Sequence, residues 1–232
     1  LPHDVRHGDI ILIDDGLIEL KVESVNKAET RIECKVVVGG TVFTHKGINV
    51  PTASISTDPF TKKDRKDAEF GIKHHVDYIA LSFVKTAENI LALKQMLKQK
   101  KSFIKVIAKI ERHEAITNME EIIRASDAVM VARGDLGVEM PAEQVPLYQK
   151  KIIHLCNLYG KPVIVATQIL NSMVTEPRAT RAEISDAATA IFDHADAFML
   201  TNETAVGKYP VESVHTLSKV AGAVENELKN HQ

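Results

Sequence analysis

Five short apolar runs recur along the larger, second part of the 232-residue chain, and their spacing limits the fold more than any other feature. Successive runs begin about 24 to 35 residues apart, and segments with helical periodicity lie between them. Solid apolar strands that alternate with helices in this way are typical of a parallel sheet covered by helices, so we predict an α/β fold. A closed barrel of this type needs about eight strands, which indicates either an open sheet or part of a larger barrel. The runs are YIALS (78–82), IKVIAK (104–109), AVMVA (128–132), VIVAT (163–167) and AFML (197–200).

Residues 1–50 follow a different pattern. Short runs rich in valine and isoleucine, some of them alternating polar and apolar residues, predict a small all-β unit. Pro51 and Pro59 then lie in a stretch rich in serine and threonine, which indicates a boundary between two domains. A helix is expected to begin directly after it, because Thr61 and Asp64 have the spacing of a capping box.

Composition excludes several classes of function. The formal net charge is −2 and no block of basic residues is present, so we expect no nucleic-acid partner. No apolar run approaches the roughly 20 residues of a membrane span, and the first residues lack the pattern of a secretory signal. Cys34 and Cys156 are far apart and have no ligand-like spacing, which is typical of reduced thiols. We therefore expect a cytoplasmic protein that acts on small molecules.

Polar side chains follow each of the five apolar runs at its carboxyl end. In parallel α/β folds, ligands bind at this edge of the sheet. The sequence therefore predicts one shared site built from five strand ends. The residues are Ser82 and Lys85; Lys109 and Glu111; Arg133 and Asp135; Thr167 and Gln168; and Thr201, Asn202 and Glu203.

Two of these carboxylates point to a metal. Glu111 and Asp135 follow consecutive strands, so a parallel sheet would hold them side by side, where they would repel each other without a cation between them. Oxygen ligands favour Mg²⁺ or Mn²⁺, and Lys109 would add positive charge suited to a phosphoryl group or an enolate. Taken singly, such residues are more often solvated loop charges, and that alternative stays open. A zinc site of the HExxH type is excluded, because Thr117 stands where the second histidine would be.

Seven segments stand out in order along the chain: DDGLIEL (14–20), HKGINVP (45–51), KIERHEAI (109–116), MVARGDLGVEMPAEQVP (130–146), NLYGKPVIVATQIL (157–170), PRATRAEISDAATAIFDHADAFML (177–200) and NETAVGKYP (202–210). Together they resemble the signature segments of pyruvate kinase. That resemblance implies a (β/α)8 TIM barrel, a small β domain (the B domain) inserted after its third strand, and a separate C-terminal domain. Residues 1–52 are then expected to be the later half of the inserted domain and 53–232 the C-terminal part of the barrel (A domain), with about five strands, and with the C-terminal domain absent.

The resemblance implies a glycolytic activity, phosphoryl transfer from phosphoenolpyruvate to ADP. By matching position, Lys109 resembles the lysine that steadies the transferred phosphoryl group and the enolate. Glu111 and Asp135 resemble the Mg²⁺ (or Mn²⁺) ligands, and Asp135 also borders the substrate. Thr167 resembles the threonine that helps to protonate the enolate. One departure is Asn202, where the family commonly has glycine, which changes the surroundings of that proton relay.

Other residues match supporting positions of the family. The backbones of Ala132 and Gly134 match groups near the substrate carboxylate, and Ser82 matches a ligand of K⁺, although most other ligands of that ion belong to the missing half-barrel. Lys46 and Asp15 match residues of the inserted domain that close over ADP or ATP. The resemblance also implies that the complete enzyme is a homo-oligomer, whereas the oligomeric state of this chain stays open. Without the first three barrel strands and their arginines, we expect this chain by itself to hold an incomplete site.

Two other functions remain open from the sequence. One is a catalytically inactive, truncated pyruvate-kinase-like fragment that serves as an assembly module. The other is a metal-dependent aldolase or lyase that cleaves oxaloacetate-like acids at the same lysine and carboxylates. The expected remnant of the inserted domain, with Lys46, favours a nucleotide substrate and therefore the phosphotransferase.

Overall fold

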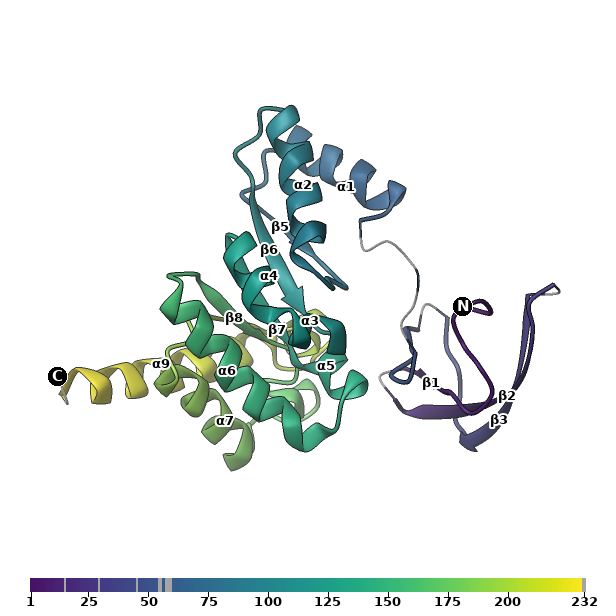
Figure 1. Cartoon of the computed structure of the whole chain (residues 1–232). Helices are drawn as coiled ribbons and strands as arrows, with labels where there is room; N and C mark the ends of the chain where they lie inside the picture. The colour runs from purple at the N-terminus through teal and green to yellow at the C-terminus, as the bar shows by residue number, and fades with distance from the viewer. Residues whose placement is uncertain (15, 29, 45, 54–55, 57–59, 231–232) are drawn as a thin grey trace.

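A computed structural model describes residues 1–14, 16–28, 30–44, 46–53, 56 and 60–230. Its strands form two separate sheets, one antiparallel with four strands and one parallel with five. Figure 1 shows the antiparallel sheet, with β1, β2 and β3 labelled, to one side of the helices and strands of the parallel part. We call the first the β unit and the second the barrel part.

The β unit contains β1 (Ile10–Ile13), β2 (Ile18–Asn26), β3 (Arg31–Val38) and β4 (Ile48–Asn49), in the sheet order β3-β2-β1-β4. All its strand pairs are antiparallel. Its small core consists of Val5, Ile11, Val22 and Val50, all nearly inaccessible to solvent. The alternation of buried and exposed residues in β2 is the expected result of a sheet with one covered face.

The barrel part is built on the five predicted strands, and each apolar run forms a strand within one or two residues of its expected limits. All neighbours are parallel, and the order is sequential, so the carboxyl ends of the strands meet at one edge. The described residues form no closed barrel, and the fold is therefore a partial α/β barrel. The strands are β5 (Tyr78–Leu81), β6 (Lys105–Ile110), β7 (Ala128–Ala132), β8 (Val163–Ala166) and β9 (Ala197–Met199).

Helices fill the connections between these strands. The capping box predicted for the first is confirmed: Thr61 N donates to Asp64 Oδ2 (2.8 Å) and Asp64 N donates to Thr61 Oγ1 (3.2 Å). Among the helices of the described ranges, none is long and apolar enough to cross a membrane. The helices are α1 (Lys62–Lys73), α2 (Ala87–Gln99), α3 (His113–Thr117), α4 (Met119–Ala125), α5 (Arg133–Glu139), α6 (Val145–Leu158), α7 (Arg181–Phe192), α8 (Asn202–Ala205) and α9 (Pro210–Asn230), with 3₁₀ turns at Ala142–Gln144 and Asn171–Val174.

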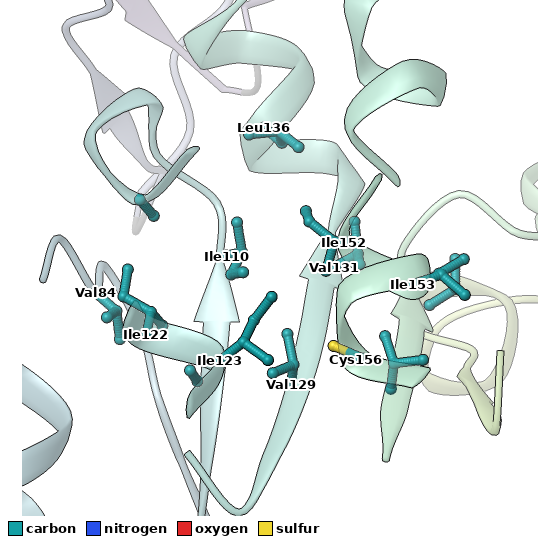
Figure 2. Close-up of a cluster of buried hydrophobic side chains, with 14 of the residues drawn as sticks. Val84, Ile110, Ile122, Ile123, Val129, Val131, Leu136, Ile152, Ile153 and Cys156 are labelled. Atoms are coloured by element: carbon teal, nitrogen blue, oxygen red, sulfur yellow. The ribbon is translucent and has the colours of Figure 1, made fainter. Parts of the chain in front are cut away.

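The main core lies between the parallel sheet and its helices. Figure 2 shows Ile110, Val129 and Val131 of the strands packed with Ile123 of α4 and Ile152 of α6. The opposite face of the sheet, which we call the inner face, carries a smaller cluster formed by Ile107, Ala128, Met130 and Ala166. Since successive side chains along a strand point to opposite faces, residues of β6 that are two or four positions from Ile107 also lie on the inner face.

Helix α5 is one of several short elements that were not expected from the sequence. Helix α5 begins at Arg133, immediately after β7, so Arg133, Gly134 and Asp135 form the first turn of a short helix. The sequence pattern of 133–139 contains two glycines, which disfavour helix. Leu136, buried and packed in the main core, stabilises this helix through tertiary contact.

Candidate active site

Strand alternation places the predicted lysine and one predicted carboxylate on the inner face. Lys109 and Glu111 lie two and four residues after Ile107, at the carboxyl end of β6. Ser82 follows β5, whose register pairs Leu81 with Ala108, so Ser82 lies beside Lys109. Lys109 Nζ donates to Ser82 Oγ at 2.8 Å.

Lys109 also forms an ion pair with Glu111. Its Nζ lies 2.9 Å from Glu111 Oε2, and the Lys109 side chain is 23% exposed whereas that of Glu111 is 0% exposed. The ammonium group is therefore the part of this pair that a ligand at the sheet edge can reach.

Glu111 is a buried carboxylate that is only partly satisfied. The Phe83 N–H donates to Oε1 at 2.6 Å, and Phe83 has a left-handed φ of 55°. The other oxygen, Oε2, has Lys109 as its ion-pair partner but accepts no hydrogen bond of regular geometry from the residues that the structure describes. Burial raises the pKa of this carboxyl, the charge of Lys109 opposes that rise, and the charge of Asp135 adds to it. A cation at Oε2 would favour the ionised form.

Asp135 lies in the first turn of α5, after the neighbouring strand β7. Its negative charge adds to the raised pKa of the Glu111 carboxyl. The pair offers oxygen donors only, one of them a buried oxygen without a regular hydrogen bond, which is a donor set that fits Mg²⁺ or Mn²⁺.

Thr167 is held against the turn that carries Gly134. Gly134 N donates to Thr167 Oγ1 at 2.7 Å, and this hydroxyl donates to Ala166 O at 2.6 Å. A Cβ atom at position 134 would lie 3.3 Å from Thr167 Oγ1, so glycine permits this close approach. Ala132, the last residue of β7, is 1% exposed and lies just before that turn.

Arg133 fixes the backbone that carries this hydroxyl. Its Nη2 donates to the carbonyl oxygens of Thr167 and Gln168, at 3.0 Å each, and its Nη1 pairs with Asp186. Thr167 and Gln168 have φ values of 67° and 51°, a left-handed conformation that is unfavourable for residues other than glycine. The guanidinium fork therefore stabilises a strained turn at the site.

The fifth strand end differs from the other four. Glu203 is 1% exposed, and its carboxylate accepts hydrogen bonds from Leu170 N (3.0 Å) and Thr201 N (2.9 Å). This residue joins the segments after β8 and β9 and does not face an open site. Asn202, by contrast, is exposed at the start of α8.

The residues predicted for the nucleotide are held in the β unit. Lys46 Nζ lies 2.8 Å from Asp14 Oδ1, an ion pair between the segments that flank β4 and β1. Asp15 lies outside the described residues.

Comparison with known proteins gives a family for this arrangement. The family model described as pyruvate kinase, barrel domain, matches residues 1–214. The chain belongs to the pyruvate kinase family. Among its relatives, the pyruvate kinase of Thermotoga maritima is 50% identical over 229 residues, which cover 99% of this chain and 49% of the relative. The enzyme of Bacillus licheniformis is 50% identical over 233 residues (100% and 40%), and pyruvate kinase 2 of Synechocystis is 49% identical over 227 residues (98% and 38%). The chain thus spans less than half the length of these relatives.

In this member of the pyruvate kinase family, the structure brings Ser82, Lys109 and Glu111 into contact, and it joins Thr167 to Gly134. Two supporting interactions were missed from the sequence. The Phe83 N–H that donates to Glu111 is a backbone group and leaves no signal in the residue type. The role of Arg133 was weakly indicated by the sequence. An arginine directly after a buried strand lies close to backbone carbonyl groups, to which it can donate hydrogen bonds.

Proposed function

We propose that this chain carries the metal-binding and phosphoryl-transfer part of a pyruvate kinase active site, and that the reaction is Mg²⁺-dependent transfer of phosphoryl from phosphoenolpyruvate to ADP. The observation that supports this most is the Lys109–Glu111 pair: an accessible ammonium 2.9 Å from a buried carboxylate oxygen that lacks a regular hydrogen bond. In this reaction a P–O bond of phosphoenolpyruvate breaks, a new P–O bond forms to ADP, and the enolate that remains takes up one proton to become pyruvate.

Lys109 places a positive charge at the reacting phosphoryl group. Ser82 Oγ and Glu111 Oε2 bind its ammonium from two sides, at 2.8 and 2.9 Å, so its orientation is fixed before substrate binds. A preorganised charge of this kind stabilises the negative charge that develops on the phosphoryl oxygens and then on the enolate oxygen.

Glu111 and Asp135 would hold the divalent ion. When bound, Mg²⁺ or Mn²⁺ supplies positive charge that binds phosphate and carboxylate oxygens of the substrate. The two carboxylates keep their mutual distance because β6 and β7 are neighbours in register, and because Phe83 N–H orients Glu111.

Thr167 is proposed to deliver the proton to the enolate. Its hydroxyl accepts from Gly134 N and donates to Ala166 O. To protonate the enolate carbon, the O–H would turn away from Ala166 O, give up its proton and take another from solvent. The backbones of Ala132 and Gly134 are proposed to face the substrate carboxylate. Binding of the carboxylate to the Gly134 N–H would compete with Thr167.

The remaining residues are assigned supporting roles. We propose that Lys46 and Asp15 act on the nucleotide, with Lys46 exchanging its present partner Asp14 for a phosphate. Ser82 is proposed as one ligand of a K⁺ site.

Two measurements on the purified chain test this proposal. Coupled assay of pyruvate release from phosphoenolpyruvate, ADP and Mg²⁺ tests the full reaction. Proton exchange at the methyl group of pyruvate in ²H₂O, followed by NMR with added Mg²⁺, tests the enolate half that Lys109 and Thr167 would perform. Metal-dependent exchange that is lost in Lys109→Met supports the assignment. If the purified chain cleaved oxaloacetate in the absence of ADP and showed no such proton exchange, the proposal would be contradicted.

A further inference from the structure

A buried polar contact joins the β unit to the barrel part. Asn49 Nδ2, at the end of β4, donates to Glu139 Oε1 at 3.3 Å, and these residues lie 90 positions apart in the chain. Asn49 is 8% exposed and Glu139 is 4% exposed. Buried polar groups need partners, and loss of one partner leaves the other with its full desolvation penalty. The contact therefore favours one placement of the β unit on the barrel part.

The Glu139 end of this contact is joined to both segments that carry the carboxylates proposed to bind metal. Glu139 is four residues after Asp135 in α5, one helical turn along the same side of that helix. His113 is two residues after Glu111, and its Nδ1 lies 3.3 Å from Glu139 Oε2. Arg112 Nη2 lies 3.8 Å from the same oxygen. Glu139 is thus tied to Asp135 through helix α5, and to the segment that carries Glu111 through His113 and Arg112.

A second metal ion is an alternative explanation for these side chains. Donor atoms of His113, Glu114 and Glu139 all lie within 4.8 Å of one another. However, Arg112 Nε lies 3.0 Å from Glu114 Oε2, and Lys85 Nζ lies 3.9 Å from Glu114 Oε1. Two cations already balance the two carboxylates, so an additional divalent ion would meet like charge. The cluster is better explained as a polar contact between the two units.

On the other side of the contact, Asn49 is close in sequence to the nucleotide-facing lysine. Asn49 pairs with Leu12 of β1, and Lys46, three residues before Asn49, pairs with Asp14, two residues after Leu12. Three residues of extended chain span about 10 Å at most. Any shift of Asn49 relative to Glu139 is therefore transmitted to Lys46.

We propose that Glu139 is a positioning residue, which through Asn49 sets the placement of the β unit, and with it Lys46, over the carboxylates of the barrel part. The placement is a property of the chain itself. Its effect on nucleotide binding rests on the function proposed above.

Distances between spin labels test the placement without any catalytic turnover. Labels are attached at Val37→Cys in β3 (native residue 52% exposed) and Phe103→Cys in the barrel part (96% exposed), in a Cys34→Ser background. Cys156 stays unlabelled because its side chain is 0% exposed and burial raises the pKa of its thiol to about 12. We expect a narrow distribution of distances in this parent protein.

Asn49→Asp places a carboxylate against Glu139. We expect the distance distribution to broaden to about twice its width or more, because two buried like charges replace a hydrogen bond. Adding Glu139→Gln to that variant should restore the narrow distribution, since the new amide can donate to the new carboxylate. Asn49→Ala serves in place of Asn49→Asp if that variant does not fold. Glu143→Gln, which removes a carboxylate from an exposed position in the adjacent 3₁₀ turn, is the matched control.

A distribution for Asn49→Asp or Asn49→Ala equal to that of the parent would overturn the proposal, as would failure of the double variant to restore it. If the chain turns over substrate, Asn49→Asp should raise KM for ADP about tenfold, the effect of losing one buried hydrogen bond, with little change in KM for phosphoenolpyruvate. If the chain has no activity, the distances between the spin labels still test the placement of the β unit. An active chain with an unchanged distance distribution refutes this inference alone.

Discussion

The guanidinium group of Arg133 donates to the carbonyl oxygen of Thr167 from both Nε, at 3.3 Å, and Nη2, at 3.0 Å. The first residue of α5 thereby holds the first residue after β8 in a left-handed conformation. In the same turn Gly134 N donates to the Thr167 hydroxyl, so adjacent residues fix both the backbone and the side chain of Thr167.

Replacement of the Arg133 guanidinium group should make the position of the Thr167 hydroxyl less well defined. We expect Arg133→Lys to lower metal-dependent proton exchange of pyruvate about tenfold or more, because a lysine cannot donate to two carbonyls in one plane.

Gln168→Gly tests the backbone strain in the same turn. Glycine adopts the φ of 51° seen at this position without strain, so we expect the free energy of unfolding to rise by about 1 kcal/mol. Urea denaturation measures this effect, and a loss of stability in Gln168→Gly would contradict the assignment of strain.

Removal of the Lys109 ammonium should stop the chemistry. We expect Lys109→Met to reduce phosphoryl transfer, or the proton exchange of pyruvate, by about 100-fold or more, the typical effect of losing one group that stabilises developing charge. Lys105→Met is a matched control, because Lys105 begins the same strand and is exposed. Equal rates for the two variants would remove Lys109 from the mechanism.

Metal binding should depend on both carboxylates. We expect Glu111→Gln and Asp135→Asn each to weaken Mn²⁺ affinity by more than the roughly 10- to 100-fold that loss of a supporting residue causes. The electron paramagnetic resonance signal of free Mn²⁺ measures this affinity directly. Glu121→Gln, at an exposed position of α4, controls for the loss of one negative charge. Wild-type affinity in either site variant would locate the ion elsewhere.

Asp127 should make stability depend on pH in the acid range. Burial raises the pKa of this carboxyl, but the hydrogen bond from Val106 N (2.8 Å) and the charge of Lys94 (2.9 Å) outweigh burial, and the net pKa is lowered. A group with a lower pKa in the folded state binds fewer protons there than in the unfolded state, so its contribution is complete above the unfolded pKa of about 3.9 and is lost as pH falls through the folded value.

We therefore expect Asp127→Asn to be less stable than the parent near neutral pH, and the difference to shrink on acidification below about pH 4. Urea midpoints measured from neutral pH into the acid range give the result. Asp67→Asn is the control, since Asp67 forms an exposed pair with Lys63, and exposed pairs contribute little. A difference between parent and Asp127→Asn that stays constant with pH would exclude the carboxylate as its cause.

Much of the barrel part was predictable because its signals are local. The apolar runs marked β5 to β9, and Thr61 with Asp64 marked the start of α1. Helix α5 was missed, since 133–139 contains two glycines and depends on burial of Leu136. The place of the candidate site followed from a topological rule: consecutive parallel strands gather their carboxyl ends, so Lys109 contacts Ser82, which follows the neighbouring strand.

Local patterns in the sequence were enough to predict the five strands of the parallel sheet, because hydrophobic periodicity acts over short stretches of chain. Three contacts could be seen only once the elements had packed: Glu203 is buried between two loops, Phe83 N–H binds Glu111, and Asn49 binds Glu139. These contacts involve backbone groups or residues as much as 90 positions apart. Their partners are chosen by burial and geometry after the elements have packed, and no local pattern records that choice.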